Sequence, residues 1–156
     1  MTNEMNMMHF DSILPELKAT NVKQIFQGLS AHVSHLIGTP EKFLFDSLME
    51  LEKQESSGIG NSVAISHMRL PRLTRPMIIY SKLSHMVNFN ANDGEPVDLI
   101  CLVLSPEFEG PKHLRRLAKV TRFFNDKHFC DQLRQANNKE EVRFALKEIN
   151  DRKLAA

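Results

Sequence analysis

Apolar residues recur at helical spacing near the start of the chain. Over residues 22–37 they fall three or four positions apart, which predicts an amphipathic helix. Asn21 is placed to cap this helix, and Gly38 to end it. A second helix is expected to follow, capped by Thr39 and with Pro40 at its first helical position. The first third of the chain is therefore predicted to be mainly helical.

Strand patterns occupy the stretches around and after these helices. Short apolar runs at residues 11–14, 63–65 and 77–80 predict strands, and residues 97–104 predict a longer one. The last run is apolar at nearly every position. That pattern is typical of a central strand that is covered on both faces.

Helices return at the C-terminal end, at residues 111–125, at residues 127–135 and after Asn138. The first of them is expected to bury one face, made of Leu114, Leu117, Ala118, Thr121 and Phe124. Helices first, strands in the middle and helices last favour an α/β fold, a three-layer α/β/α sandwich with a central mixed β-sheet. No linker divides the chain, so residues 10–152 are predicted to form one domain after a mobile N-terminal extension, residues 1–9.

Composition narrows the classes of protein that fit. Among 156 residues, 20 Lys and Arg face 19 Asp and Glu, and this balance disfavours a nucleic-acid binder. The longest apolar run is far shorter than the roughly 20 residues of a membrane span, and the N-terminus lacks a secretory pattern. Two widely separated cysteines, Cys101 and Cys130, fit buried thiols in a reducing compartment. We therefore expect a cytoplasmic protein without membrane insertion.

Histidine is the residue type that carries candidate chemistry, with seven in the chain. His32 and His35 lie one helical turn apart, but no third ligand is near them, so no metal site is predicted. His67 follows a turn of small residues and a short β run. The backbone amides of such a turn bind anions well, although the same pattern also fits a plain tight turn that enters a strand.

Residues 57–67, Ser-Gly-Ile-Gly-Asn-Ser-Val-Ala-Ile-Ser-His, resemble a known signature. It is that of the enzyme IIA proteins of the bacterial phosphoenolpyruvate-dependent phosphotransferase system, in the mannitol/fructose class. Residues 92–100 are similar to the family's turn and core strand, and residues 113–118 to the helix that carries a second histidine. The resemblance covers residues 10–150 and is strongest to the nitrogen-regulatory branch.

The resemblance implies a phosphocarrier. It places the phosphorylated residue at His67, and it makes His113 a supporting hydrogen-bond donor to the phosphate. The expected helpers at the phosphate are Ser57, Gly58, Gly60 and Asn61. Because histidine titrates near pH 6.5, its imidazole is mostly an unprotonated nucleophile at neutral pH. No cofactor is expected. The implied partners are a phosphorylated HPr-type carrier and regulatory target proteins or transporters.

Two positions depart from the family pattern. Ser66 stands where the family has proline, a change expected to alter loop stiffness more than reactivity. Leu51 stands where the family has an arginine that stabilises the phosphohistidine, and its loss is expected to weaken the site by roughly 10–100-fold. Arg69 is a candidate replacement cation, and Arg115 and Arg116 are alternatives.

Two other functions stay open. One is a fructose- or mannitol-specific IIA that passes its phosphate to a separate IIB protein. The other is a non-catalytic protein-binding module of the same fold. The helix that begins near His113 is rich in Lys and Arg, which fits either an ordinary solvated face or a docking surface for a partner.

Overall fold

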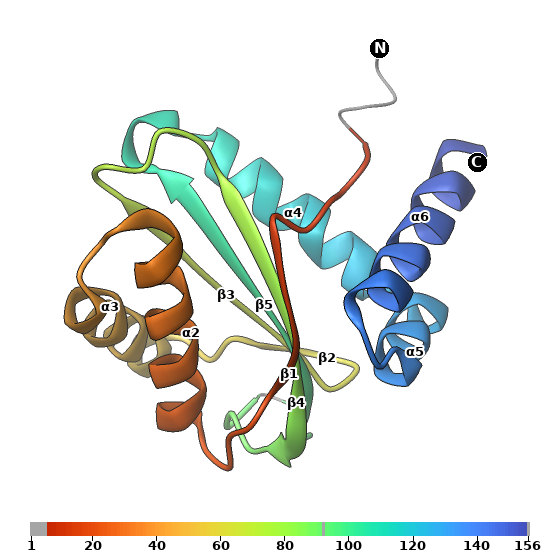
Figure 1. The fold of residues 1–156 in the computed structure, drawn as a ribbon, viewed down its shortest axis with the longest axis horizontal. Coiled ribbons are helices and arrows are strands. Elements are labelled where there is room, and N and C mark those ends of the chain that lie inside the picture. The colour runs from red at the N-terminus through yellow and green to blue at the C-terminus, as the bar shows by residue number, and fades with distance from the viewer. Residues whose placement is uncertain (1–5, 92, 156) are drawn as a thin grey trace.

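The structure is a computed structural model that describes residues 6–91 and 93–155. These residues form a five-stranded sheet between two layers of helices (Figure 1). The strand order is β1-β4-β5-β3-β2. β4 pairs with β5 and β2 with β3 antiparallel, whereas β1 with β4 and β3 with β5 are parallel. The strands are β1 (Ser12–Leu17), β2 (Gly58–Gly60), β3 (Val63–Leu70), β4 (Met77–Val87) and β5 (Val97–Pro106). The predicted three-layer sandwich with a mixed sheet is confirmed.

Two helices, α2 (Val22–Ile37) and α3 (Glu41–Gln54), cover one face of the sheet (Figure 1). As predicted, the side chain of Asn21 caps α2 by accepting a hydrogen bond from the Gln24 amide, at 2.8 Å. Gly38 ends the helix in the left-handed region, with φ of 78°. The second helix begins one residue later than predicted, because Pro40 rather than Thr39 is its N-cap.

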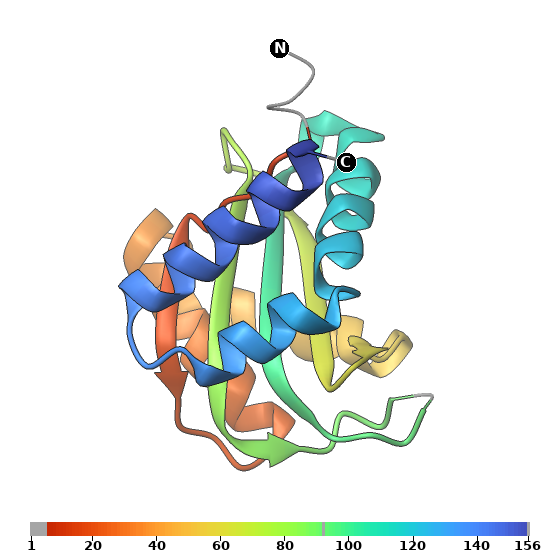
Figure 2. The same ribbon diagram turned by 90° about the vertical axis from the view of Figure 1, so that its right-hand side faces the viewer.

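The other face is covered by α4 (Lys112–Phe124), α5 (Lys127–Gln135) and α6 (Lys139–Ala155), which Figure 2 shows in front of the sheet. A short 3-10 helix, Glu107–Glu109, leads into α4. The predicted buried face of α4 is wrong at Leu114, which is 60% exposed, and at Ala118, which is also exposed. In the first turn of α4 the buried residue is instead His113, whose side chain faces the sheet.

The strands extend further than the sequence indicated. β3 runs on to Leu70 and β4 to Val87, and the three-residue β2 was not predicted. Polar residues such as Ser66 and Ser81 interrupt the apolar runs, but their backbones still pair with β5 and their side chains are buried. His67 consequently lies inside β3, opposite Val103 of β5, and not at the end of a strand.

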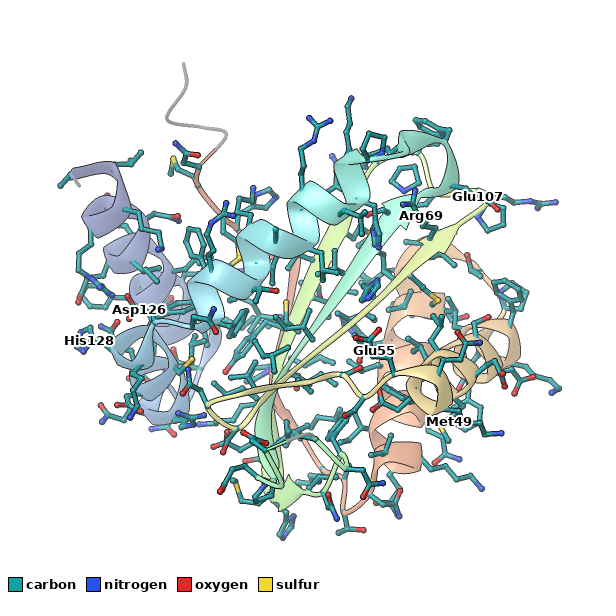
Figure 3. All side chains as sticks on the ribbon, turned by 180° about the vertical axis from the view of Figure 1, so that it is seen from behind. Met49, Glu55, Arg69, Glu107, Asp126 and His128 are labelled. Atoms are coloured by element: carbon teal, nitrogen blue, oxygen red, sulfur yellow. The ribbon has the colours of Figure 1, made fainter. Side chains whose placement is uncertain are left out.

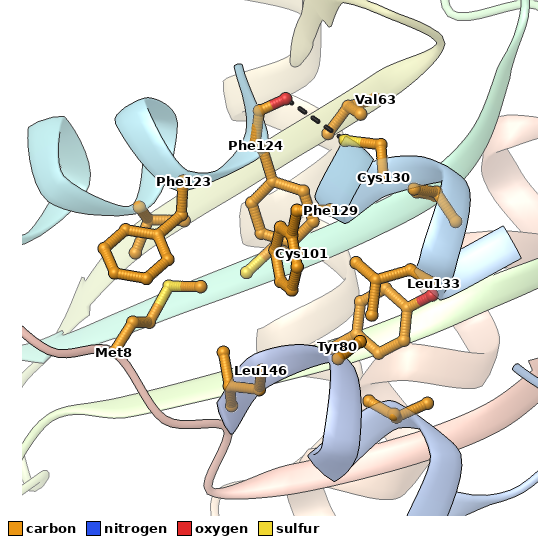
Figure 4. Close-up of a cluster of buried hydrophobic side chains, with 14 of the residues drawn as sticks. Met8, Val63, Tyr80, Cys101, Phe123, Phe124, Phe129, Cys130, Leu133 and Leu146 are labelled. Atoms are coloured by element: carbon orange, nitrogen blue, oxygen red, sulfur yellow. Dashed lines mark hydrogen bonds between the residues drawn. The ribbon is translucent and has the colours of Figure 1, made fainter. Parts of the chain in front are cut away.

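Part of the expected N-terminal extension belongs to the core. The Met8 side chain is 1% exposed and packs among the buried residues between the sheet and the C-terminal helices (Figure 4). Its backbone amide donates to Asn150 Oδ1 at 3.0 Å, and Asn150 Nδ2 donates to its carbonyl at 2.8 Å. The boundary predicted at residue 10 is therefore too late for Met8. Residues 1–5 lie outside the described residues.

The two cysteines lie in this same cluster (Figure 4). Both are free and buried, as the sequence predicted, and the Cys130 thiol donates to the Phe124 carbonyl at 3.2 Å. Burial raises the pKa of Cys130 to about 11. Both thiols therefore pack as small apolar groups at neutral pH.

Candidate functional site

His67 projects toward α4 from the middle of β3. Side chains alternate along the strand, so the buried Met68 and Leu70 face α2 and α3, whereas His67 shares its face with Val63 and Ile65. Parallel pairing with β5 over the whole length of β3 fixes the backbone beneath the imidazole. The histidine is thus held on a regularly paired strand, beyond the point where β2 stops pairing with β3.

The second predicted histidine meets the first directly. His67 Nδ1 and His113 Nε2 are 3.0 Å apart, with the ring centroids 5.1 Å from each other. His113 comes from the first turn of α4 and is 3% exposed, whereas His67 is partly exposed. One ring nitrogen of His67 is therefore occupied, and Nε2, on the opposite edge of the ring, has no hydrogen-bond partner among the described residues.

A buried chain of polar groups stands behind His113. Its Nδ1 is 2.6 Å from the Oγ of Ser105, which is fully buried at the end of β5. Arg116 Nη1 donates to the same oxygen at 2.6 Å, and Arg116 Nη2 donates to Glu109 at 2.7 Å. Arg116 is thereby directed away from His67, so it does not serve as the replacement cation that the sequence left open.

The loop before β2 is closed on itself by side chains. Ser57 Oγ donates to Glu52 Oε1 at 2.6 Å, and the Ser57 amide donates to the other oxygen of Glu52 at 3.0 Å. Because the Ser57 proton is used in this way, Ser66 Oγ donates to Ser57 Oγ at 2.9 Å. The departure from the family proline therefore introduces a hydroxyl that ties β3 to this loop.

The predicted phosphate helpers separate into two groups. Ser57 and Gly58 line the same cavity as His67. A Cβ on Gly58 would lie 2.5 Å from that of Ala91, which explains the need for glycine there. Gly60 and Asn61 do not line either cavity that His67 lines, because both have positive φ and form the tight turn into β3.

That turn is held by a charged contact far from the imidazole. Arg134 of α5 donates to the carbonyl oxygen of Asn61 and pairs with both carboxylate oxygens of Asp98, at 2.9 and 3.0 Å. Small residues in this segment thus serve two purposes. The first half borders the site, and the second half turns the chain.

Two adjoining cavities meet at His67. One, of about 600 Å³, is bordered by Glu52, Glu55 and the loop of Ser57 and Gly58. The other, of about 660 Å³, is lined by residues that include His113, Leu114 and Arg69. Leu51, which is 39% exposed, lines both, so a hydrocarbon side chain occupies the place where the resemblance leads us to expect a guanidinium.

Charges of both signs surround the imidazole. Glu55 follows α3, and Arg69 lies toward the end of β3, on the same side of the molecule as Glu107 (Figure 3). Burial lowers the pKa of His67 below its usual value; Glu55 opposes this effect and Arg69 reinforces it. The ring is therefore neutral at physiological pH, as a nucleophile must be.

His113 is held in the neutral form more firmly. Burial is the main reason that its pKa falls to about 4; His67, Arg69 and Arg116 contribute to this lowering, and Glu109 opposes it. A neutral ring between Ser105 and His67 has one N–H donor and one acceptor nitrogen.

Acid should destabilise the fold through His113. The unfolded chain binds a proton near pH 6.5 that the folded His113 takes up only near pH 4. The stabilisation is therefore complete above pH 6.5 and is lost as the pH falls toward 4, by roughly 3 kcal/mol. Urea titrations at pH 7, 6 and 5 should show it, with a smaller loss in His113→Gln. A free energy of unfolding that stays constant between pH 6.5 and 5 would contradict the assignment.

The structure adds two findings on other classes of site. Within residues 6–91 and 93–155, no three His, Cys, Asp or Glu side chains gather in a way that could hold a metal ion. Among the described helices, none combines the length and the apolar character that crossing a membrane requires.

Known proteins resemble the chain over most of its length. The family described as "Phosphoenolpyruvate-dependent sugar phosphotransferase system, EIIA 2" matches residues 6–149. A nitrogen regulatory protein of Bradyrhizobium diazoefficiens is 35% identical over 132 residues, which cover 85% of this chain and 86% of the relative. The nitrogen regulatory protein of Escherichia coli is 30% identical over 149 residues, covering 91% of each chain.

A solved structure agrees with these relatives. The nitrogen regulatory protein IIA-Ntr of Neisseria meningitidis superposes with a TM-score of 0.79 at 29% identity, over 86% of this chain and 92% of that one. The chain therefore belongs to the EIIA type 2 family of the phosphoenolpyruvate-dependent phosphotransferase system.

Proposed function

We propose that this chain is a cytoplasmic phosphocarrier and regulatory protein that accepts a phosphoryl group on His67 from a phosphorylated HPr-type carrier. The observation that carries the proposal is the pairing of His67 Nδ1 with His113, which orients the imidazole. Nε2 lies at the junction of two cavities and has no hydrogen-bond partner among the described residues. Nε2 is accordingly the nitrogen that receives the phosphoryl group.

The transfer balances between two imidazoles. The Nε2 electron pair of His67 forms the new P–N bond while the P–N bond of the donor breaks, and that electron pair returns to the donor ring. His67 gives up the single ring proton of neutral imidazole, and the leaving imidazole takes up one. Such a transfer needs mainly in-line positioning and charge stabilisation, both of which a fixed ring and a nearby cation provide.

Arg69 is the cation that we assign to the phosphoryl group. It is exposed, lines a cavity with His67, and makes no hydrogen bond to another described residue. Ser57 contributes only if it leaves Glu52, since that carboxylate takes both of its donors. His113 has both ring nitrogens occupied, and so it orients the His67 ring rather than contacting the phosphate.

The relatives support regulation as the outcome of phosphorylation. The relatives from Bradyrhizobium diazoefficiens and Escherichia coli are named nitrogen regulatory proteins, and so is the solved structure from Neisseria meningitidis. We propose that the phosphorylation state of His67 changes which regulatory proteins or transporters the chain binds. HPr-type carriers and these targets are thus its proposed partners.

Two alternative functions each have one observation in their favour. A fructose-specific EIIA component of Haloferax volcanii is 26% identical over 67% of the chain, which keeps transfer to a IIB protein open. Leu51 in place of a guanidinium favours the other alternative, a binding module that no longer carries phosphate.

One labelling experiment distinguishes the three. The full chain is incubated with a phosphorylated HPr-type carrier and then with a purified IIB protein. We expect acid-labile, base-stable phosphate on the chain that does not pass to IIB; passage to IIB would show the sugar-transport alternative. No label, together with partner binding that is the same in wild type, His67→Ala and His67→Asp, would show the binding module.

A further inference from the structure

Ser105 lies at the centre of the buried chain behind the two histidines. Its side chain is fully buried, and two groups approach its oxygen at 2.6 Å, Arg116 Nη1 and His113 Nδ1. A guanidinium donates and never accepts, so Arg116 occupies one lone pair of Ser105 Oγ. The Ser105 proton must then find a different acceptor.

His113 Nδ1 is the only acceptor that the described residues place within reach of the Ser105 proton. A buried hydroxyl whose proton has no acceptor is costly, and so Ser105 donates to this nitrogen. A neutral His113 that accepts at Nδ1 carries its proton on Nε2. That proton points at His67 Nδ1, 3.0 Å away.

We infer that Ser105 and Arg116 are positioning residues that fix His113 as a hydrogen-bond donor to Nδ1 of His67. Glu109 completes the arrangement by taking the second Nη of Arg116 at 2.7 Å, within a pair whose side chains are only 15% and 9% exposed. The guanidinium is thereby held in the one orientation that presents Nη1 to Ser105. Neither residue touches the phosphoryl group.

This arrangement suits the phosphorylated ring. The inference rests on the proposed function, in which Nε2 of His67 carries the phosphoryl group. A neutral phosphohistidine of this kind has a bare electron pair on Nδ1, and His113 supplies the donor for it. The resting His67 then carries its ring proton on Nε2, and this proton must leave as the Nε2 electron pair attacks phosphorus. Glu55, a carboxylate that lines the same cavity as His67, is the base that takes it up, and the leaving imidazole of the donor takes up a proton in turn. Nδ1 is an acceptor before and after transfer.

The same donor protects the phosphohistidine from water. Such groups are acid-labile because protonation of the second ring nitrogen turns the ring into a better leaving group. Water then attacks phosphorus, and the P–N electron pair returns to the ring. His113 fills Nδ1 with a hydrogen bond but cannot hand over its proton, since its own Nδ1 is already taken by Ser105. The positive charge of Arg116 polarises the Ser105 hydroxyl and so strengthens its hydrogen bond to His113. This matters in a chain where Leu51, and not an arginine, lines the cavity beside His67.

The tautomer itself is tested on the unphosphorylated wild type. Nitrogen-15 NMR of the histidine side chains at pH 7.5 distinguishes a protonated ring nitrogen from a bare one. We expect His113 to be protonated at Nε2 and bare at Nδ1, with His67 bare at Nδ1. A proton on Nδ1 of His113 would overturn the inference while leaving the proposed function intact.

Variants test the consequence for the phosphorylated protein. Ser105→Ala should mix the two tautomers of His113 and shorten the lifetime of the phosphohistidine by roughly 2–10-fold, the value of one hydrogen bond. Ser105→Thr keeps the hydroxyl and should restore both the single tautomer of His113 and the lifetime of the phosphohistidine. Ser30→Ala is the matched control, since Ser30 is also fully buried but lies on α2 and its hydroxyl has no partner among the described residues. Unchanged His113 signals in Ser105→Ala would overturn the inference.

Discussion

His67→Ala is expected to take up no phosphate from a phosphorylated HPr-type carrier, whereas the wild type becomes labelled. The loss should be complete, because the substitution removes the nucleophile itself. His113 does not replace it, since its two ring nitrogens are bonded to Ser105 and His67 and its side chain is 3% exposed. Acid-labile, base-stable label on the purified variant measures this directly.

The control for this variant is another histidine. His85 is exposed on β4 and bonds only its neighbour Ser84 among the described residues, so His85→Ala should label as the wild type does. Undiminished label on His67→Ala would show that the acceptor is elsewhere. Equal loss in both variants would point to a general defect in docking with the carrier.

Leu51→Arg is expected to lengthen the lifetime of the phosphohistidine by roughly 10–100-fold. Leu51 lines both cavities that meet at His67, so a guanidinium there reaches the phosphoryl oxygens from the α3 side. A charge-assisted hydrogen bond is worth about 1.5–3 kcal/mol, which corresponds to that range. The added charge also offsets Glu55, whose carboxylate acts on the same imidazole.

Two further variants separate geometry from charge. Leu51→Gln adds a polar side chain without a charge and should give little of the gain. Leu36→Arg adds the same charge to an equally exposed leucine on α2 and should leave the lifetime unchanged. The measurement is the decay of label at pH 7.5 after the carrier has been removed. A lifetime in Leu51→Arg no longer than that of the wild type would show that Arg69 already supplies all the cationic stabilisation the site uses.

The sequence predicted the layers of the fold because hydrophobic spacing records which faces are covered. Residues 99–104 are apolar on both sides and lie at the centre of the sheet in β5. Hydrophobic spacing did not predict the full length of strands that contain polar residues. Ser66 and Ser81 shortened the predicted strands although their backbones pair throughout, since pairing depends on neighbouring strands and not on side-chain polarity.

The two histidines were predicted from motifs, but their surroundings were not. Ser105 has no distinguishing mark in the sequence, since a serine at the end of an apolar strand is common. Its place follows from the β3–β5 register, which sets Ser105 opposite Arg69, and from the phase of α4, which turns His113 inward. For Gly60 and Asn61 the sequence is misleading in the opposite way. A loop of small residues predicts an anion-binding site, but the backbone of these two residues, with positive φ, makes a turn instead.

The position of the phosphoryl group tests the account most directly. Phosphorus-31 and nitrogen-15 NMR of the wild-type chain, labelled in its histidine rings and phosphorylated by an HPr-type carrier, reports which ring nitrogen is bonded to phosphorus. We predict a single P–N bond at Nε2 of His67, with Nδ1 bare and hydrogen-bonded to His113. A phosphoryl group on another residue, or on Nδ1 of His67, would contradict the account.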